Sequence, residues 1–309
     1  EHSTVSRDIL GEVLERLGAE VIPLGRSEVF IPVDTEAIRD EDVSLAHHWC
    51  REYQLDSIVS ADGDGDRPLV SDEHGRWLRG DIIGILCARV LGARCVVTPV
   101  SSNTAVERCG WFDRVIRTRI GSPYVIAGMQ QAEHEGMSAI VGYEANGGFL
   151  QQSELTVNGH LLPALPTRDA IIVPLAILSL SEQMNCPISG LDKLLPKRYT
   201  FSDRLKDFPT ENAHQLLEPM LTDDDEANLA AARALLHDAF GDIVAIDTTD
   251  GVRLTLATGN IVHIRPSGNA PELRCYTESD SEETCIRLNR RCLAFLSQWL
   301  EKHQPLIKR

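Results

Sequence analysis

Apolar side chains near the start of the chain recur at the spacing of a helix. Between residues 5 and 17 they stand three or four positions apart, and Gly18 follows as a natural stop. A short apolar run at 21–24 comes next, and a second helical stretch leads into the strand-like residues 58–61. The pattern predicts alternating helix and strand. The row of the first helix consists of Val5, Ile9, Val13 and Leu17, with Leu10 and Leu14 beside it.

The alternation continues through the middle of the chain. Helical spacing covers residues 82–91 and 124–136, and short apolar runs of strand type cover 95–98, 115–118 and 139–142. Alternating elements of this kind are typical of α/β layers built on a parallel sheet. A further long apolar helix follows them.

The pattern of apolar and polar residues changes near Pro187. Strand-like runs then appear at 243–248, 252–256 and 261–264, separated by glycine-containing turn signals, and a helical row closes the chain. We therefore expect α/β layers followed by an α+β region. The expected domains are residues 1–78, 79–187 and 188–309.

Length and charge narrow the function classes. A chain of 309 residues with 43% hydrophobic side chains can bury sizeable cores in two or three domains. Its 46 acidic and 30 basic side chains give a formal charge of -16, which repels nucleic acid and anionic membranes, so we expect neither as a partner. Any phosphate must bind in a local cationic pocket. No stretch matches a membrane helix or a signal segment, and the cysteines show no C-x-x-C spacing, which together favour a cytoplasmic protein with reduced thiols.

Three carboxylates alternate with glycine directly after the strand-like residues 58–61. Asp62, Asp64 and Asp66 supply hard oxygen ligands on one short loop, the chemistry that suits Mg²⁺. Arg67 follows, and a guanidinium beside a metal can bind a phosphate group through bidentate hydrogen bonds. The alternatives are a solvated acidic turn and a calcium EF-hand. The EF-hand pattern fails because Arg67 stands where that loop needs glycine, and because strands rather than helices are expected on both sides.

Two further loops carry groups suited to a sugar phosphate. After the strand at 139–142, Glu144 and Asn146 stand among glycines, where they can bind hydroxyls, although an ordinary turn has the same composition. Near the C-terminus, Arg265 and a hydroxyl lie in a loop stiffened by two prolines, a composition that favours an anion nest, with a structural loop that carries an exposed arginine as the alternative. The residues of this nest are Arg265, Ser267, Gly268 and Asn269.

Together the loops resemble the α-D-phosphohexomutase superfamily. The matching motifs are D-G-D-G-D-R from Asp62, G-x-E-x-x-G around Glu144, and R-x-S-G-N-x-P from Arg265, in the family's order and spacing. The resemblance covers essentially the whole chain. It implies two phosphohexomutase-type α/β domains, one for metal and one for sugar, and a C-terminal phosphate-binding α+β domain of TATA-binding-protein-like fold.

The resemblance also implies roles for single residues. Asp62, Asp64 and Asp66 would bind Mg²⁺, Arg67 would lie near the transferring phosphoryl group, and Glu144 and Asn146 would contact the sugar. The C-terminal loop would hold the phosphate that is not reacting. The family's phosphoserine belongs to a further N-terminal domain, and no loop like the one that carries it occurs here, so this chain alone is expected to be inactive. The metal-binding domain is likewise expected to lack its first strand.

Several positions depart from the family pattern and leave the sugar open. Ser101 and Ser122 replace a lysine and a histidine of many bacterial members, and the sugar loop has Asn146 and Gly148 in place of a serine and a histidine. The resemblance still implies a mutase that acts on hexose phosphate and hexose bisphosphate, and phosphomannomutase is the first expectation. Phosphoglucomutase, phosphoglucosamine mutase and a non-catalytic sugar-phosphate-binding protein remain as alternatives, and the oligomeric state stays open.

Overall fold

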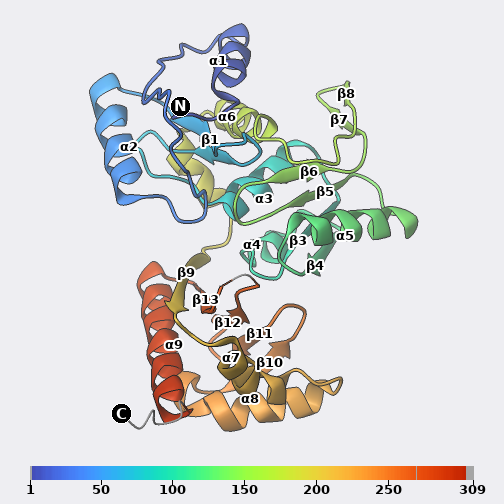
Figure 1. Cartoon of the computed structure of the whole chain (residues 1–309). Helices are drawn as coiled ribbons and strands as arrows, with labels where there is room; N and C mark the ends of the chain where they lie inside the picture. The colour runs from blue at the N-terminus through green and yellow to red at the C-terminus, as the bar shows by residue number, and fades with distance from the viewer. Residues whose placement is uncertain (1, 269, 304–309) are drawn as a thin grey trace. The chain divides into compact units, whose positions relative to one another are not determined.

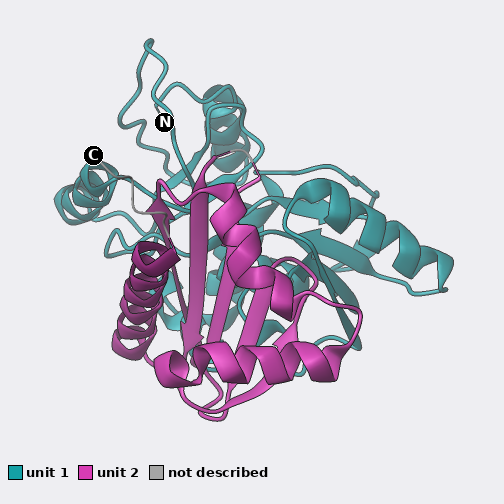
Figure 2. Ribbon diagram, turned by 60° about the horizontal axis from the view of Figure 1, so that its bottom comes forward, with its two compact units in different colours: residues 1–196 teal, residues 197–309 magenta. Residues whose placement is uncertain are grey.

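The chain folds into two compact units. The computed structural model describes residues 2–268 and 270–303, and the units comprise residues 1–196 and 197–309 (Figures 1 and 2). Within the described residues, every helix is too short or too polar to cross a lipid bilayer. All eight cysteines are free, and most of them are buried.

A four-stranded sheet lies at the centre of the first unit. Its strands are β3 (Cys95–Pro99), β4 (Arg114–Thr118), β5 (Ile140–Tyr143) and β6 (Phe149–Gln151). They lie in the order β4-β3-β5-β6, with β3 parallel to β4 and β5, and β6 antiparallel to β5. Each residue of β3 is buried, as expected for a central strand covered on both faces.

Helices cover both faces of this sheet (Figure 1). Successive strand residues point to opposite sides. Val96 therefore joins the core that contains α3 (Gly80–Val90) and α6 (Ile172–Met184), whereas Val97 joins the core that contains α5 (Ser122–His134). This three-layer arrangement confirms the predicted α/β class.

Smaller elements complete the first unit. They are α1 (Arg7–Arg16), α2 (Asp40–Tyr53), the hairpin of β1 (Val59–Ala61) and β2 (Pro68–Val70), α4 (Ala105–Arg108), the hairpin of β7 (Leu155–Val157) and β8 (His160–Leu162), and the 3-10 helix η1 (Ile188–Leu194). Buried side chains of η1 belong to the same core as α3 and α6. The division at residues 78 and 187 stays a prediction.

In the N-terminal region, the strand expected at residues 21–24 is wrong, whereas the amphipathic helix expected before it is confirmed as α1. Residues 21–24 form no strand, and this segment and the start of β1 both line one cavity of about 460 Å³. Helix α1 buries Leu10 and Leu14, while Val5 and Leu17 of the predicted row are 75% and 69% exposed.

The second unit is an antiparallel sheet covered by helices on one face (Figure 2). Its strands are β9 (Tyr199–Lys206), β10 (Ile243–Asp247), β11 (Val252–Leu256), β12 (Ile261–Pro266) and β13 (Glu272–Ser279), in the order β10-β11-β12-β13-β9. Its helices are α7 (Thr210–Leu217), η2 (Glu218–Met220), α8 (Asp225–Phe240) and α9 (Glu282–His303). The alternating burial of β11 matches a sheet with one apolar face, and the predicted α+β character is confirmed.

Candidate functional site

The acidic loop joins β1 to β2 and is closed by its own backbone. The N–H of Asp62 donates to the carbonyl of Arg67 at 3.1 Å, and the N–H of Gly65 donates to the carbonyl of Asp62 at 3.1 Å. The Asp62 carboxylate accepts from the N–H groups of Asp66 and Arg67 at 3.2 and 3.1 Å. Gly65 has φ 73°, a conformation that side chains rarely adopt, so a glycine is required there. Antiparallel strands flank the loop, unlike the helices of an EF-hand.

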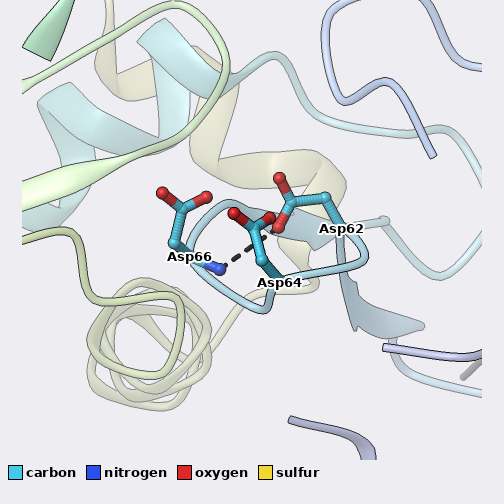
Figure 3. Close-up of side chains that lie close together, drawn as sticks. All are labelled: Asp62, Asp64 and Asp66. Atoms are coloured by element: carbon cyan, nitrogen blue, oxygen red, sulfur yellow. Dashed lines mark hydrogen bonds between the residues drawn. The ribbon is translucent and has the colours of Figure 1, made fainter. Parts of the chain in front are cut away.

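The three aspartates come together on this loop. One oxygen from each of Asp62, Asp64 and Asp66 lies within 4.8 Å of the others, and Figure 3 shows the three carboxylates gathered at one loop. Burial raises the pKa of Asp62, and the carboxylates of Asp66 and Asp64 add to that effect. The Oδ1 atom of Asp66 is buried and accepts no hydrogen bond from the described residues. A cation bound here would satisfy this oxygen and relieve the repulsion, so the donor set fits a metal ion.

Arg67 lies between two of these carboxylates. Its Nε atom is 3.6 Å from Asp62 Oδ2 and 3.6 Å from Asp66 Oδ1, which is an ion-pair distance rather than a hydrogen bond. The side chain is 36% exposed. A partly accessible guanidinium beside a cluster of metal-binding carboxylates can also bind an anion.

The glycine-rich turn connects β5 to β6. The N–H of Glu144 donates to the carbonyl of Gly148, and the N–H of Gly147 donates to the carbonyl of Glu144, both at 3.0 Å. The Oδ1 atom of Asn146 accepts from the Gly148 N–H at 2.9 Å, so this oxygen shapes the loop and is already engaged. The Thr35 hydroxyl donates to the Asn146 carbonyl at 2.7 Å.

Arg168 connects the two loops, a link that the sequence did not predict. Its Nε and Nη2 atoms donate to Glu144 Oε2 at 2.9 and 2.6 Å, and its Nη1 donates to Asp66 Oδ2 at 2.8 Å. Arg168 stands between β8 and α6, 20 positions beyond Gly148 and outside any recognisable motif. Sequence alone could have singled it out only as a charged residue placed directly before an apolar helix.

The proposed phosphate nest belongs to the second unit. Arg265 lies in β12, and its Nε pairs with Asp250 Oδ2 at 2.9 Å. The Ser267 N–H donates to the carbonyl of Glu272 at 2.9 Å, so this donor is used within the loop. Gly268 is exposed, and Asn269 lies outside the described residues. Arg274 stands directly opposite Arg265 in the β12–β13 register, which places a second guanidinium on the same face of the sheet.

A buried histidine supports the Asp250–Arg265 pair. His263 is 1% exposed, and its Nε2 lies 2.6 Å from the Asp250 carbonyl, which can only accept. Nε2 therefore carries the proton, and Nδ1 is left buried without a hydrogen-bond partner among the described residues. Burial lowers the pKa of His263 to about 4, with the cations of Arg253 and Arg265 adding to the effect.

The second unit should lose stability as the pH falls from about 6.5 toward 4. In that window the unfolded chain takes up a proton on His263 that the folded protein excludes, because the folded pKa of about 4 lies below the ordinary value of 6.5. In His263→Gln this contribution should vanish. Urea midpoints at several pH values between 7 and 4 measure it, and equal pH slopes for the two proteins would contradict the neutral, buried state of His263.

Comparisons with known proteins cover most of the chain. The family models for the phosphoglucomutase/phosphomannomutase alpha/beta/alpha domain III and C-terminal domain match residues 79–199 and 220–292. Phosphomannomutases of Salmonella muenchen and Sinorhizobium fredii are 47% and 43% identical over 93% and 96% of this chain. The chain spans 59% and 61% of the length of these two relatives.

A solved structure shows the same fold. The phosphoglucomutase/phosphomannomutase family protein of Burkholderia thailandensis matches with a TM-score of 0.68 and 16% sequence identity. The match covers 96% of this chain and 59% of that protein.

Proposed function

The chain belongs to the α-D-phosphohexomutase superfamily, and from this membership we propose that the protein is a phosphomannomutase. It would interconvert hexose 6-phosphate and hexose 1-phosphate through a hexose bisphosphate. The joining of the Asp66 and Glu144 loops by Arg168 carries this proposal, because it brings a cation-binding loop and a hydroxyl-binding carboxylate into one site. The identity to two phosphomannomutases favours mannose phosphates over the alternatives.

Asp62, Asp64 and Asp66 are proposed to hold Mg²⁺. Their oxygens converge, and the buried Asp66 Oδ1 accepts no hydrogen bond from the described residues. When bound, the ion would neutralise charge on the phosphoryl group during transfer. Asp62 also holds the loop closed through its hydrogen bonds to backbone N–H groups, so it fixes the geometry of the other two ligands.

The remaining residues bind and orient the substrate. Arg67 would hold an oxygen of the transferring phosphoryl group, and Glu144 would accept hydrogen bonds from sugar hydroxyls. In the second unit, Arg265 would bind the non-reacting phosphate with help from the C-terminal loop. The loop residues with this proposed role are Ser267, Gly268 and Asn269. A bisphosphate could then turn round and present either end.

The nucleophile is proposed to be a phosphoserine outside these 309 residues. The chain contains no loop of the kind that carries this serine in the family. The proposed activity therefore belongs to the full-length protein. Mass spectrometry of that protein should detect a phosphoserine.

Steady-state rates on three substrates test the proposal and separate the alternatives. The full-length protein with Mg²⁺ and a trace of bisphosphate should show its highest kcat/KM on mannose 1-phosphate. Glucose 1-phosphate and glucosamine 1-phosphate should be poorer substrates. A preference for either of these two would replace phosphomannomutase by phosphoglucomutase or phosphoglucosamine mutase.

A further inference from the structure

One guanidinium bridges two carboxylates that belong to different loops of the first unit. Arg168 donates two hydrogen bonds to the same oxygen of Glu144 and a third to Asp66, and its side chain is only 17% exposed. Charge-assisted bonds of this kind fix both partners in orientation. Because both Glu144 bonds go to Oε2, the Oε1 atom takes no part in the pair.

The glycine at position 148 makes room for this bridge. A Cβ atom on Gly148 would lie 3.0 Å from Cδ and 3.0 Å from Nε of Arg168, closer than nearly all real Cβ contacts. Arg168 thus lies across the position that a side chain at residue 148 would occupy.

The bridge also balances charge at the site. Asp62, Asp64, Asp66 and Glu144 contribute four negative charges, and Arg67 and Arg168 contribute two positive ones, which leaves a net charge of about -2. A divalent cation would bring the sum to zero. Asp66 would then serve both cations, since its Oδ2 accepts from Arg168 and its buried Oδ1 accepts no hydrogen bond from the described residues.

We propose that Arg168 is a positioning residue that orients Glu144 toward the sugar hydroxyls and couples substrate binding to the metal loop. The inference rests on the proposed function for the identity of the substrate. Arg168 is expected to change the affinities for the sugar phosphate and for the metal ion in opposite directions. Arg168 strengthens sugar-phosphate binding by fixing Glu144, and it weakens metal binding because its positive charge contacts a metal ligand.

The opposite changes expected in the two dissociation constants make the role of Arg168 testable. In the full-length protein, Arg168→Met should raise the dissociation constant of mannose 6-phosphate about tenfold, since the buried Glu144 loses its charged donors. The same substitution should lower the dissociation constant of Mg²⁺ roughly threefold, because a cation next to Asp66 is removed. Isothermal titration measures both constants without relying on turnover, and KM and kcat follow in parallel.

Two more variants separate positioning from folding. Gly148→Ala keeps the arginine but displaces it, so it should weaken mannose 6-phosphate binding in the same direction. Arg39→Met is the matched control, because Arg39 also donates two hydrogen bonds to a buried carboxylate, that of Asp42, which belongs to neither loop. Arg39→Met should leave both constants unchanged. If Arg168→Met fails to fold, Arg168→Lys replaces it, since a single ammonium cannot reproduce the three bonds.

Each outcome decides the inference. Weaker sugar-phosphate binding with tighter Mg²⁺ binding supports it. If Arg168→Met binds both ligands equally more weakly, or if its dissociation constants match those of Arg39→Met, the inference is overturned. A wild-type protein that lacks mutase activity would contradict the proposed function. The two titrations would still test the positioning role of Arg168, because they measure binding and not turnover. A wild-type protein that binds neither ligand overturns the role of Arg168 as well.

Discussion

Replacing Asp64 with alanine in the full-length protein should reduce mutase kcat at least about 100-fold. Metal ions stabilise the transition-state charge by several kcal/mol in reactions of this kind. Each loss of about 1.4 kcal/mol lowers the rate tenfold, so a loss of at least about 2.8 kcal/mol gives the expected 100-fold decrease. Asp64 is the most exposed of the three converging aspartates and makes no hydrogen bond that closes the loop, so the fold should survive the change.

A second readout separates metal loss from misfolding. Mg²⁺ should raise the melting temperature of the wild-type protein and leave that of Asp64→Ala unchanged, because only a bound ion stabilises the folded state. Asp56→Asn, an exposed aspartate just before β1 and outside the loop, is the control and should behave like wild type. Full activity and unchanged magnesium dependence in Asp64→Ala would show that the loop is not the metal site.

Arg265→Ala should lower kcat/KM at least roughly tenfold. Charge-assisted hydrogen bonds contribute about 1.5 to 3 kcal/mol each, and tenfold corresponds to about 1.4 kcal/mol. Arg265 lies 19% exposed in a pair with Asp250 and has a second guanidinium opposite it on β13, so its substitution leaves part of the positive charge in place. The loss should appear for both the monophosphate and the bisphosphate, since each needs its non-reacting phosphate held.

The control for this prediction comes from the same unit. Arg233 on α8 donates from Nε to the Ile243 carbonyl at 2.8 Å and has no proposed ligand contact. Arg233→Ala should keep normal kcat/KM. If Arg265→Ala also keeps it in a folded protein, the C-terminal loop does not bind the phosphate.

The spacing of apolar residues predicted those helices and strands whose formation depends mainly on residues close together in the sequence. The helices α3 and α5 and the strand β3 were predicted from their apolar residues, because α5 buries Val125, Met129 and Ala132 at helical spacing, while α3 and β3 are apolar runs that are buried along most of their length. The alternation of aspartate and glycine likewise predicted the gathering of Asp62, Asp64 and Asp66, since a loop this short leaves its side chains few other directions.

Contacts between distant segments could not be predicted in this way. Residues 21–24 have the composition of a strand, yet they form none and instead line a cavity, because tertiary context overrides local strand preference. Arg168 contacts Asp66 across 102 positions, and its role follows only from the packing of its segment across Gly148. Asn146 stays a predicted substrate contact, and the hydrogen bond that its Oδ1 accepts from the Gly148 N–H follows from the loop's own geometry rather than from a recognisable motif.

The proposed transfer of a phosphoryl group between the two ends of a hexose is tested most directly by phosphorus NMR. In this experiment, mannose 6-phosphate is incubated with the full-length protein, Mg²⁺ and a trace of hexose bisphosphate. The predicted result is a mannose 1-phosphate signal that grows to equilibrium and is abolished by chelating the magnesium. A mannose 6-phosphate signal that stays unchanged in the presence of protein that binds the sugar would contradict the claim and identify a binding protein instead.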